Sequence, residues 1–281
     1  MKILALVSSH RKRGNTARIV EMIAGQMKAI AARQQEPLEF DTIFLSDMDV
    51  RTCRGCRTCF DRGEDKCPLT DDVPSIRARL DSVDALILAS PIYVDDVNGI
   101  AKNWMDRMAY VCHRPAFGGK CAYSVATVGG SSTRHALRTM NAALLTWGFH
   151  LAGHSGHKMG ALMDQAEMES RYREETALAA QRLFRAISEQ QALRPSFVSL
   201  IAFKIQQLAW QREPPGSYDY VYWEKRGWLA ADRTFYVPHH ASRLKVALAR
   251  LVGAVIAPFM LGQPISSLLL RHGRQSARGG E

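Results

Sequence analysis

Long uninterrupted apolar runs are missing from this 281-residue sequence. The apolar run 246–261 is broken by Arg250 and Pro258, so it is too short to span a bilayer. The apolar segment 3–7 is too short for a signal peptide and has no small-residue cleavage site after it. We therefore expect a cytoplasmic protein, in which six cysteines are more consistent with metal or redox chemistry than with disulfides.

Several functional motifs are missing as well. No motif positions a Ser-His-Asp triad or a pair of catalytic carboxylates, and there is neither a recognisable nicotinamide site nor an internal repeat. An aromatic–basic recognition motif is absent, so we expect no nucleic-acid partner. The net charge of +10 suits acidic ligands such as phosphorylated cofactors, or an anionic membrane surface.

The first two thirds of the sequence alternate apolar runs with helical patterns. The runs at 3–7, 38–45, 85–89, 121–127 and 149–152 predict strands, and helices are predicted at 16–32, 71–81, 99–111, 133–147 and 164–190. Strands that are apolar throughout and alternate with helices are typical of a parallel sheet covered on both faces. Five of them match the flavodoxin-like, doubly wound α/β order 2-1-3-4-5, in which ligands bind beyond the carboxyl ends of the strands.

The remainder of the chain differs in composition. We predict a flavodoxin-like domain at 1–190, a mainly helical C-terminal extension at 191–270 and a disordered basic tail at 271–281. The extension contains a helix-like apolar run at 244–261 with basic flanks. That run either packs on the core or on a second subunit, or lies on a membrane surface as an interfacial helix.

The segment 8–16 follows the first predicted strand and opens the first helix. A helix N-terminus at this place binds phosphate through free backbone N–H groups and the helix dipole. Ser9, Asn15 and Thr16 add side-chain donors, and Arg11 can pair with a phosphate dianion. A polar turn that merely caps the helix is the alternative, but it needs fewer such groups.

Two further loops follow the third and fourth strands. Pro91, Ile92 and Tyr93 offer a stiff turn, free backbone amides and a flat apolar face for a planar ligand. After the fourth strand, Thr127, Gly129 and Gly130 allow close approach of the backbone to such a ligand. Each segment could also be a simple loop.

These loops resemble those of the flavodoxin-like NAD(P)H-dependent FMN reductase family. Its phosphate loop reads Gly-Ser-x-Arg-x-x-Gly-Asn-Ser/Thr, which this sequence matches except at Ser8, and its ring-side segment reads Ser/Thr-Pro-x-Tyr. The resemblance covers residues 1 to about 185. It implies that FMN is bound by Ser9, Arg11, Asn15, Thr16, Pro91, Ile92, Tyr93, Thr127, Gly129 and Gly130.

Four cysteines crowd into one stretch: Cys53, Cys56, Cys59 and Cys67, with spacing C-x2-C-x2-C-x7-C. Close thiolates at such spacing suit an iron–sulfur cluster, whereas zinc more often uses two separated C-x2-C pairs. Unligated thiols and zinc remain the alternatives. The motif resembles that of the iron–sulfur flavoproteins, a branch of the same family, which implies a [4Fe-4S] cluster near the flavin of a partner subunit.

Three histidines, His150, His154 and His157, also have the look of a ligand set. They fall where the short strand predicted at 149–152 ends in a glycine-rich loop, and we expect no metal there.

The resemblance implies an FMN-dependent oxidoreductase. Electrons would come from NAD(P)H or a ferredoxin-type donor and pass to a small acceptor such as a quinone or another flavin. It also implies a homodimer or homotetramer, because neighbouring subunits commonly complete these flavin sites. The alternative is a non-enzymatic electron carrier or redox sensor.

Overall fold

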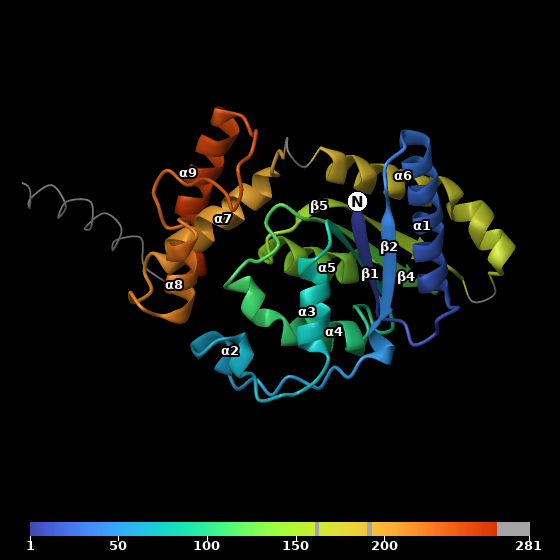
Figure 1. Cartoon of the computed structure of the whole chain (residues 1–281), viewed down its shortest axis with the longest axis horizontal. Helices are drawn as coiled ribbons and strands as arrows, with labels where there is room; N and C mark the ends of the chain where they lie inside the picture. The colour runs from blue at the N-terminus through green and yellow to red at the C-terminus, as the bar shows by residue number, and fades with distance from the viewer. Residues whose placement is uncertain (161–162, 190–192, 263–281) are drawn as a thin grey trace, which may run out of the picture. The chain divides into compact units, whose positions relative to one another are not determined.

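The structure is a computed structural model that describes residues 1–160, 163–189 and 193–262 (Figure 1). The chain divides into two compact units, Met1–Ala192 and Leu193–Glu281. In the parts that are described, no helix combines the length and the apolar character needed to cross a membrane.

The first unit is built on a five-stranded sheet. All neighbouring strands are parallel and their order is β2-β1-β3-β4-β5, which confirms the predicted topology. The strands are β1 (Lys2–Val7), β2 (Glu39–Phe44), β3 (Ala85–Pro91), β4 (Cys121–Val128) and β5 (His150–Lys158). The three central strands β1, β3 and β4 are almost wholly buried, as expected for a parallel sheet with helices on both faces.

Helices cover both faces of the sheet (Figure 1). On one face, α1 (Asn15–Gln34) and α6 (Gln165–Ser188) pack on the alternate residues of β1 that include Ile3 and Val7. On the other face, α3 (Val73–Asp81), α4 (Gly99–Arg107) and α5 (Arg134–Thr146) pack on the set that includes Leu4 and Leu6. Two apolar layers therefore hold the sheet, and they follow directly from the side-chain alternation along each strand.

Short helical segments interrupt the connections. The long connection between β2 and α3 contains α2 (Thr58–Asp61) and two 3-10 turns, η1 (Leu45–Asp47) and η2 (Glu64–Lys66). A third 3-10 turn, η3 (Ala109–Cys112), follows α4 and replaces the last turn of the helix predicted to reach residue 111.

The fifth strand is longer than predicted. It runs over nine residues, His150–Lys158, so His154 and His157, which were predicted in the loop after residue 152, lie in the strand instead. Two of its glycines lie where side chains from neighbouring elements come close. A Cβ on Gly153 would lie 2.9 Å from the Tyr123 ring, and one on Gly156 would overlap the Thr133 side chain. These glycines mark close approach within a sheet rather than a turn.

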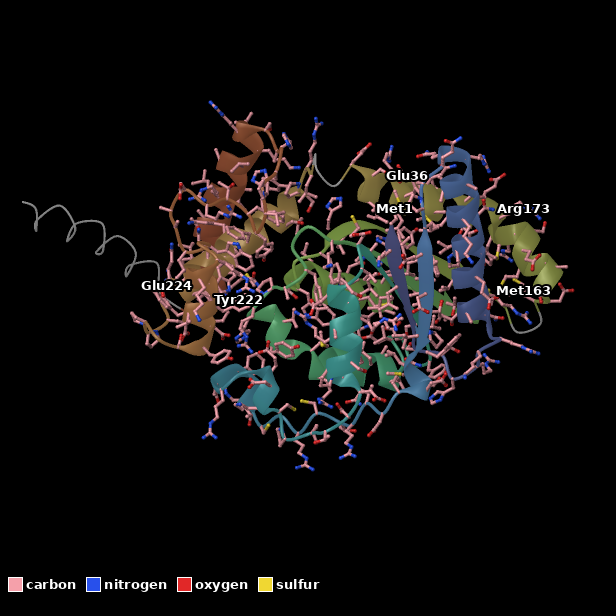
Figure 2. The ribbon with its side chains drawn as sticks, in the orientation of Figure 1. Met1, Glu36, Met163, Arg173, Tyr222 and Glu224 are labelled. Carbon is pink, nitrogen blue, oxygen red and sulfur yellow. The ribbon has the colours of Figure 1, made fainter. Side chains whose placement is uncertain are left out.

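The second unit consists of α7 (Phe197–Trp210), α8 (Tyr218–Lys225) and α9 (Arg243–Met260), which confirms a mainly helical extension. Its core is aromatic: Trp223, Trp228 and Tyr236 meet edge to face, with centroids 5.0 to 6.2 Å apart. Tyr222, labelled in Figure 2, lies on α8 and packs edge-on against Trp228. The predicted tail at 271–281 lies outside the described residues.

Candidate flavin site and cysteine-lined cavity

The predicted phosphate loop lies between β1 and α1. Ser9 Oγ accepts a hydrogen bond from the Arg11 backbone N–H (3.1 Å), and the Gly14 N–H donates to the Arg11 carbonyl oxygen (2.9 Å). A Cβ on Gly14 would lie 3.0 Å from both the Cβ and the carbonyl oxygen of Arg11, so this tight turn favours glycine. The loop therefore presents a compact turn at the start of a helix.

The N-terminus of α1 has the chemistry that a phosphate requires. No side chain caps it through a hydrogen bond, and its first turn contains no acidic residue. Its first backbone N–H groups and its positive dipole end are consequently available to an anion. Arg11 is exposed and Asn15 is half-buried beside this end. The residues present fit the phosphate of FMN.

Thr16 and Thr127 are in contact at the carboxyl ends of the strands. Both side chains are buried, and their hydroxyl oxygens are 2.7 Å apart, which joins the start of α1 to the end of β4. Each hydroxyl can take part in a second hydrogen bond, so this contact leaves room for a ligand contact. The structure thus brings together two residues that were predicted from separate loops.

The ring-side segment begins in the sheet. Pro91 is the last residue of β3, not a loop residue, and the Ile92 N–H donates to the Thr127 carbonyl oxygen (2.8 Å). Ile92 is buried, whereas the Tyr93 side chain is 63% exposed. Tyr93 is therefore the side chain of this segment that is open to a flat ligand, while Pro91 and Ile92 set the backbone.

The loop after Tyr93 is held by α5. Asp95, with a left-handed φ of 57°, lies 3.0 Å from His135, and the Thr139 hydroxyl donates to Asp96 (3.0 Å). On the neighbouring loop, Gly129 and Gly130 are exposed, and a Cβ on either would meet no atom within 4 Å. The backbone at both glycines is therefore open to close approach by a ligand.

Asn98 links these loops, and the sequence analysis did not identify it. Its side-chain Nδ2 donates to the Ser8 carbonyl oxygen (2.7 Å), and its Oδ1 accepts from the Ala101 N–H (3.2 Å), which caps α4. Its backbone N–H donates to Ser90 Oγ (3.2 Å). An Asn followed by a helical pattern is an N-cap signal that could have identified the residue.

The cysteine-bearing segment is tied to the same helix. In the middle of α4, the Asn103 side chain accepts a hydrogen bond from the Cys53 N–H (3.3 Å) and donates one to the Val50 carbonyl oxygen (2.7 Å). Arg107 is almost fully buried, pairs with Asp71, and lies 3.7 Å from Cys67 Sγ. This anchoring was likewise not predicted. On the half-exposed side of α4, Lys102 Nζ and Asp106 Oδ1 are 2.5 Å apart and form an i,i+4 ion pair.

A cavity of about 860 Å³ lies at this segment, and all four predicted cysteines line it. All are free thiols; Cys53 and Cys56 are exposed, and Cys59 and Cys67 are half-buried. Burial is the main cause that raises the pKa of Cys59, and the negative charges of Cys67 and Cys53 add to it. The positive charge of Arg114 acts in the opposite direction. A hydrogen bond from the Thr58 side chain lowers the pKa of Cys56.

The donor set fits an iron–sulfur cluster, since four thiols face one cavity with an arginine beside them. Within the described residues, however, no three His, Cys, Asp or Glu side chains converge to ligand distance. The fit therefore lies in the chemistry and the shared cavity, and a cluster would draw the thiols closer together.

Residues 1–157 match the family described as NADPH-dependent FMN reductase. The chain belongs to this family. It is therefore a flavoprotein of an FMN-dependent oxidoreductase family. The sequence relatives place it in the iron–sulfur flavoprotein branch of that family.

An iron-sulfur flavoprotein from Archaeoglobus fulgidus is 30% identical over 156 residues, which is 55% of this chain and 67% of that protein. Another, from Methanosarcina thermophila, is 27% identical over 175 residues, which is 60% of this chain and 86% of that one. Both matches leave a large part of this chain, more than a third of it, without a counterpart.

Solved structures agree on the fold. RosB with a bound 8-demethyl-8-formylriboflavin-5'-phosphate intermediate superposes with a TM-score of 0.55 at 13% identity, covering 76% of this chain and 88% of that one. A flavone reductase superposes with a TM-score of 0.53 at 13% identity, covering 70% and 66%. At such identities the likeness concerns architecture alone.

Proposed function

We propose that this chain is an FMN oxidoreductase with a [4Fe-4S] cluster beside its flavin. Electrons enter from NAD(P)H, or from a ferredoxin-type donor through the cluster, and leave to a small acceptor such as a quinone or another flavin. One observation carries the proposal: α4 supports both sites. Its cap, Asn98, holds the loop at Ser8, and its last residue, Arg107, lies against the cysteine segment.

One short helix therefore connects the two sites, since the nine residues of α4 rise by about 14 Å. We propose electron transfer between a flavin held at one end of this helix and a cluster held at the other. In a homodimer or homotetramer, a partner subunit could offer a second route.

Each flavin-side residue has a defined part. Backbone N–H groups at the start of α1, with Ser9, Arg11 and Asn15, bind the phosphate. The exposed Tyr93 would hold the ring, and the open backbone at Gly129 and Gly130 would let the ring approach. When bound, FMN can take up electrons in pairs and release them singly, which connects two-electron donors with one-electron partners.

We propose that the [4Fe-4S] cluster is bound by four cysteines: Cys53, Cys56, Cys59 and Cys67. Arg107 brings positive charge to Cys67 Sγ and so offsets part of the negative charge that four thiolates would gather. The names of the relatives as iron-sulfur flavoproteins support this choice.

Anaerobic purification with a flavin assay, an iron assay and an absorption spectrum tests the proposal. We expect FMN and about four irons per chain. Cys59→Ser should lose the iron and keep the FMN, whereas the matched variant Cys112→Ser, outside the motif, should keep both. A protein that takes up FMN but no iron under reconstitution would remove the cluster; one that binds no FMN would remove the proposal.

The electron donor is tested separately. The purified protein is mixed anaerobically with NADH, NADPH or chemically reduced ferredoxin, and the flavin band is followed. Bleaching by a nicotinamide, followed by reoxidation with catalytic turnover of a quinone, supports the enzyme. Bleaching by ferredoxin that depends on Cys59 supports entry through the cluster. Single reduction and reoxidation without turnover would instead indicate a carrier.

A further inference from the structure

Helix α9 carries its large apolar side chains on the outside. Leu244, Leu248, Leu251, Val255 and Phe259 follow one another at spacings of four, three, four and four residues, which places them on one face of the helix. They are between 50% and 80% exposed. We call these five residues the outer stripe.

The inner face of α9 is made of small residues. Ala249, Gly253 and Ala257 are buried, and α7 packs against this side. The contact is close: a Cβ on Gly253 would lie 2.9 Å from Lys204 Cβ. A helix that needed only to pack in its own unit would put its leucines inside, so the outer stripe is not explained by the fold.

Positive charge lies beside the first half of the outer stripe. Within α9 there are three basic residues, Arg243, Lys245 and Arg250, and no acidic one. Lys245 and Arg250 donate to backbone carbonyl oxygens of Pro195, Ala231 and Arg233, contacts that leave their charges unneutralised. Over residues 193–262 as a whole, nine Lys or Arg stand against four Asp or Glu, a net charge of +5.

We propose that the outer stripe of α9 is a docking surface for an anionic lipid membrane. The helix would lie in the interface, with the stripe among the acyl chains and the basic residues at the phosphate level. It would not cross, because none of the described helices is long and apolar enough to do so. A second copy fits less well, since two surfaces of the same positive charge repel each other. The inference does not depend on the flavin chemistry.

Flotation of the full-length chain with lipid vesicles tests the proposal. The probes are vesicles of phosphatidylcholine alone and vesicles with 30% phosphatidylserine. We expect co-flotation with the anionic vesicles only, and less of it in high salt, because screening weakens the basic contacts. Leu251→Glu should weaken binding about tenfold or more, because it replaces a lipid-buried side chain by a charge.

Leu178→Glu is the matched control: it changes a comparably exposed leucine of α6 to the same charged residue. It should bind vesicles like the wild type, and bound FMN and the melting temperature verify that both variants fold. Absence of flotation overturns the proposal. So does undiminished flotation of Leu251→Glu, which would assign binding to another segment. A change of oligomeric state in Leu251→Glu, with vesicle binding unaltered, would assign the stripe to a second copy.

Discussion

The Asn98 side-chain amide donates a 2.7 Å hydrogen bond to the Ser8 carbonyl oxygen, ninety residues away in the chain. Both groups are buried, and the same side chain caps α4 through the Ala101 N–H. The end of β1, where the phosphate loop begins, is thereby fixed to the helix that also anchors the cysteine segment. A single amide sets the position of the loop against the rest of the site.

Asn98→Ala should therefore affect both stability and flavin binding. We expect the free energy of unfolding to fall by about 2–4 kcal/mol, from a lost cap and an unpaired buried carbonyl. FMN should bind about tenfold more weakly, since a loop misplacement costing about 1.4 kcal/mol suffices for that factor. Urea unfolding and quenching of FMN fluorescence measure the two effects.

Ser196→Ala is the control for this prediction. It removes the side-chain cap of α7 in the second unit, where Ser196 Oγ accepts from the Ser199 N–H (3.0 Å). It should lower stability by about 1 kcal/mol and leave FMN affinity unchanged. Equal loss of FMN affinity in both variants would show that Asn98 acts only through general stability.

The sequence was sufficient to predict the topology and the strand ends at which the candidate flavin loops lie. Buried parallel strands have a distinctive continuous apolar pattern, and β1, β3 and β4 show it. Once the strand order is known, the carboxyl ends of β1 and β4 must be neighbours of β3, and Thr16 and Thr127 come together as a consequence.

The residues that link these loops could not be predicted in the same way. Asn98 and Arg107 act through contacts with residues far away in the sequence, and no local pattern specifies such partners. Gly153 and Gly156 were misread because glycine in isolation indicates a turn. Only the positions of Tyr123 and Thr133 reveal that these glycines admit close packing in β5.

Removing the Arg107 charge should be costly. Arg107 and Asp71 form an ion pair whose side chains are almost completely shielded from solvent. Arg107→Met would leave the Asp71 carboxylate buried and uncompensated, which should cost about 3–5 kcal/mol of unfolding free energy. The double variant Arg107→Met/Asp71→Asn should recover most of this loss. Urea unfolding at pH 7 provides the values.

Lys102→Met on the same helix is the matched comparison. Its pair with Asp106 is half exposed, so its removal should cost less than about 1 kcal/mol. Similar losses for both variants would contradict the role of burial.

Because of the Arg107–Asp71 pair, we also expect the free energy of unfolding to depend on pH in the acid range. Burial opposes the charge of Asp71, but hydrogen bonds from Arg107 and from the Arg51 and Val73 N–H groups outweigh it and lower its pKa. The stability from this group is therefore present at neutral pH and is lost as pH falls through the folded pKa, below about 4. Asp71→Asn should flatten the stability profile in that range.

His157 predicts a pH dependence at milder acidity. Its ring is buried against Tyr172, and burial lowers its pKa to about 4. Glu175 Oε2 is 3.3 Å from Nδ1 and would favour the charged ring, but Nδ1 has no hydrogen-bond alignment and Glu175 is half exposed, so burial dominates. The neutral ring is the folded form at pH 7.

Between pH 6.5 and about 4 the unfolded chain therefore binds a proton that the folded chain does not. As the pH is lowered through this range, the free energy of unfolding decreases by up to about 3 kcal/mol. His157→Gln should lose less stability than the wild type between pH 7 and pH 4.5 in urea titrations. His154→Gln, exposed on the same strand, should behave like the wild type. A wild-type slope retained in His157→Gln would exclude this residue as the source.

Two glycines in helices should respond to the same substitution with opposite signs. Gly25 lies within α1, and a Cβ there would meet nothing within 4 Å, so Gly25→Ala should stabilise the first unit by about 1 kcal/mol through helix propensity. Gly253 lies within α9, where a Cβ would lie 2.9 Å from Lys204 Cβ and 3.3 Å from the Ile201 carbonyl oxygen.

Those Gly253 neighbours are close to the α7 backbone and cannot rotate away. Gly253→Ala should therefore force α7 and α9 apart and cost about 1–3 kcal/mol in spite of the better propensity of alanine. Three of the five tryptophans, Trp210, Trp223 and Trp228, lie in the core of the second unit, so thermal unfolding followed by tryptophan fluorescence should show an earlier transition in Gly253→Ala. Stabilisation by both substitutions would mean that the α7–α9 contact is looser than the structure has it.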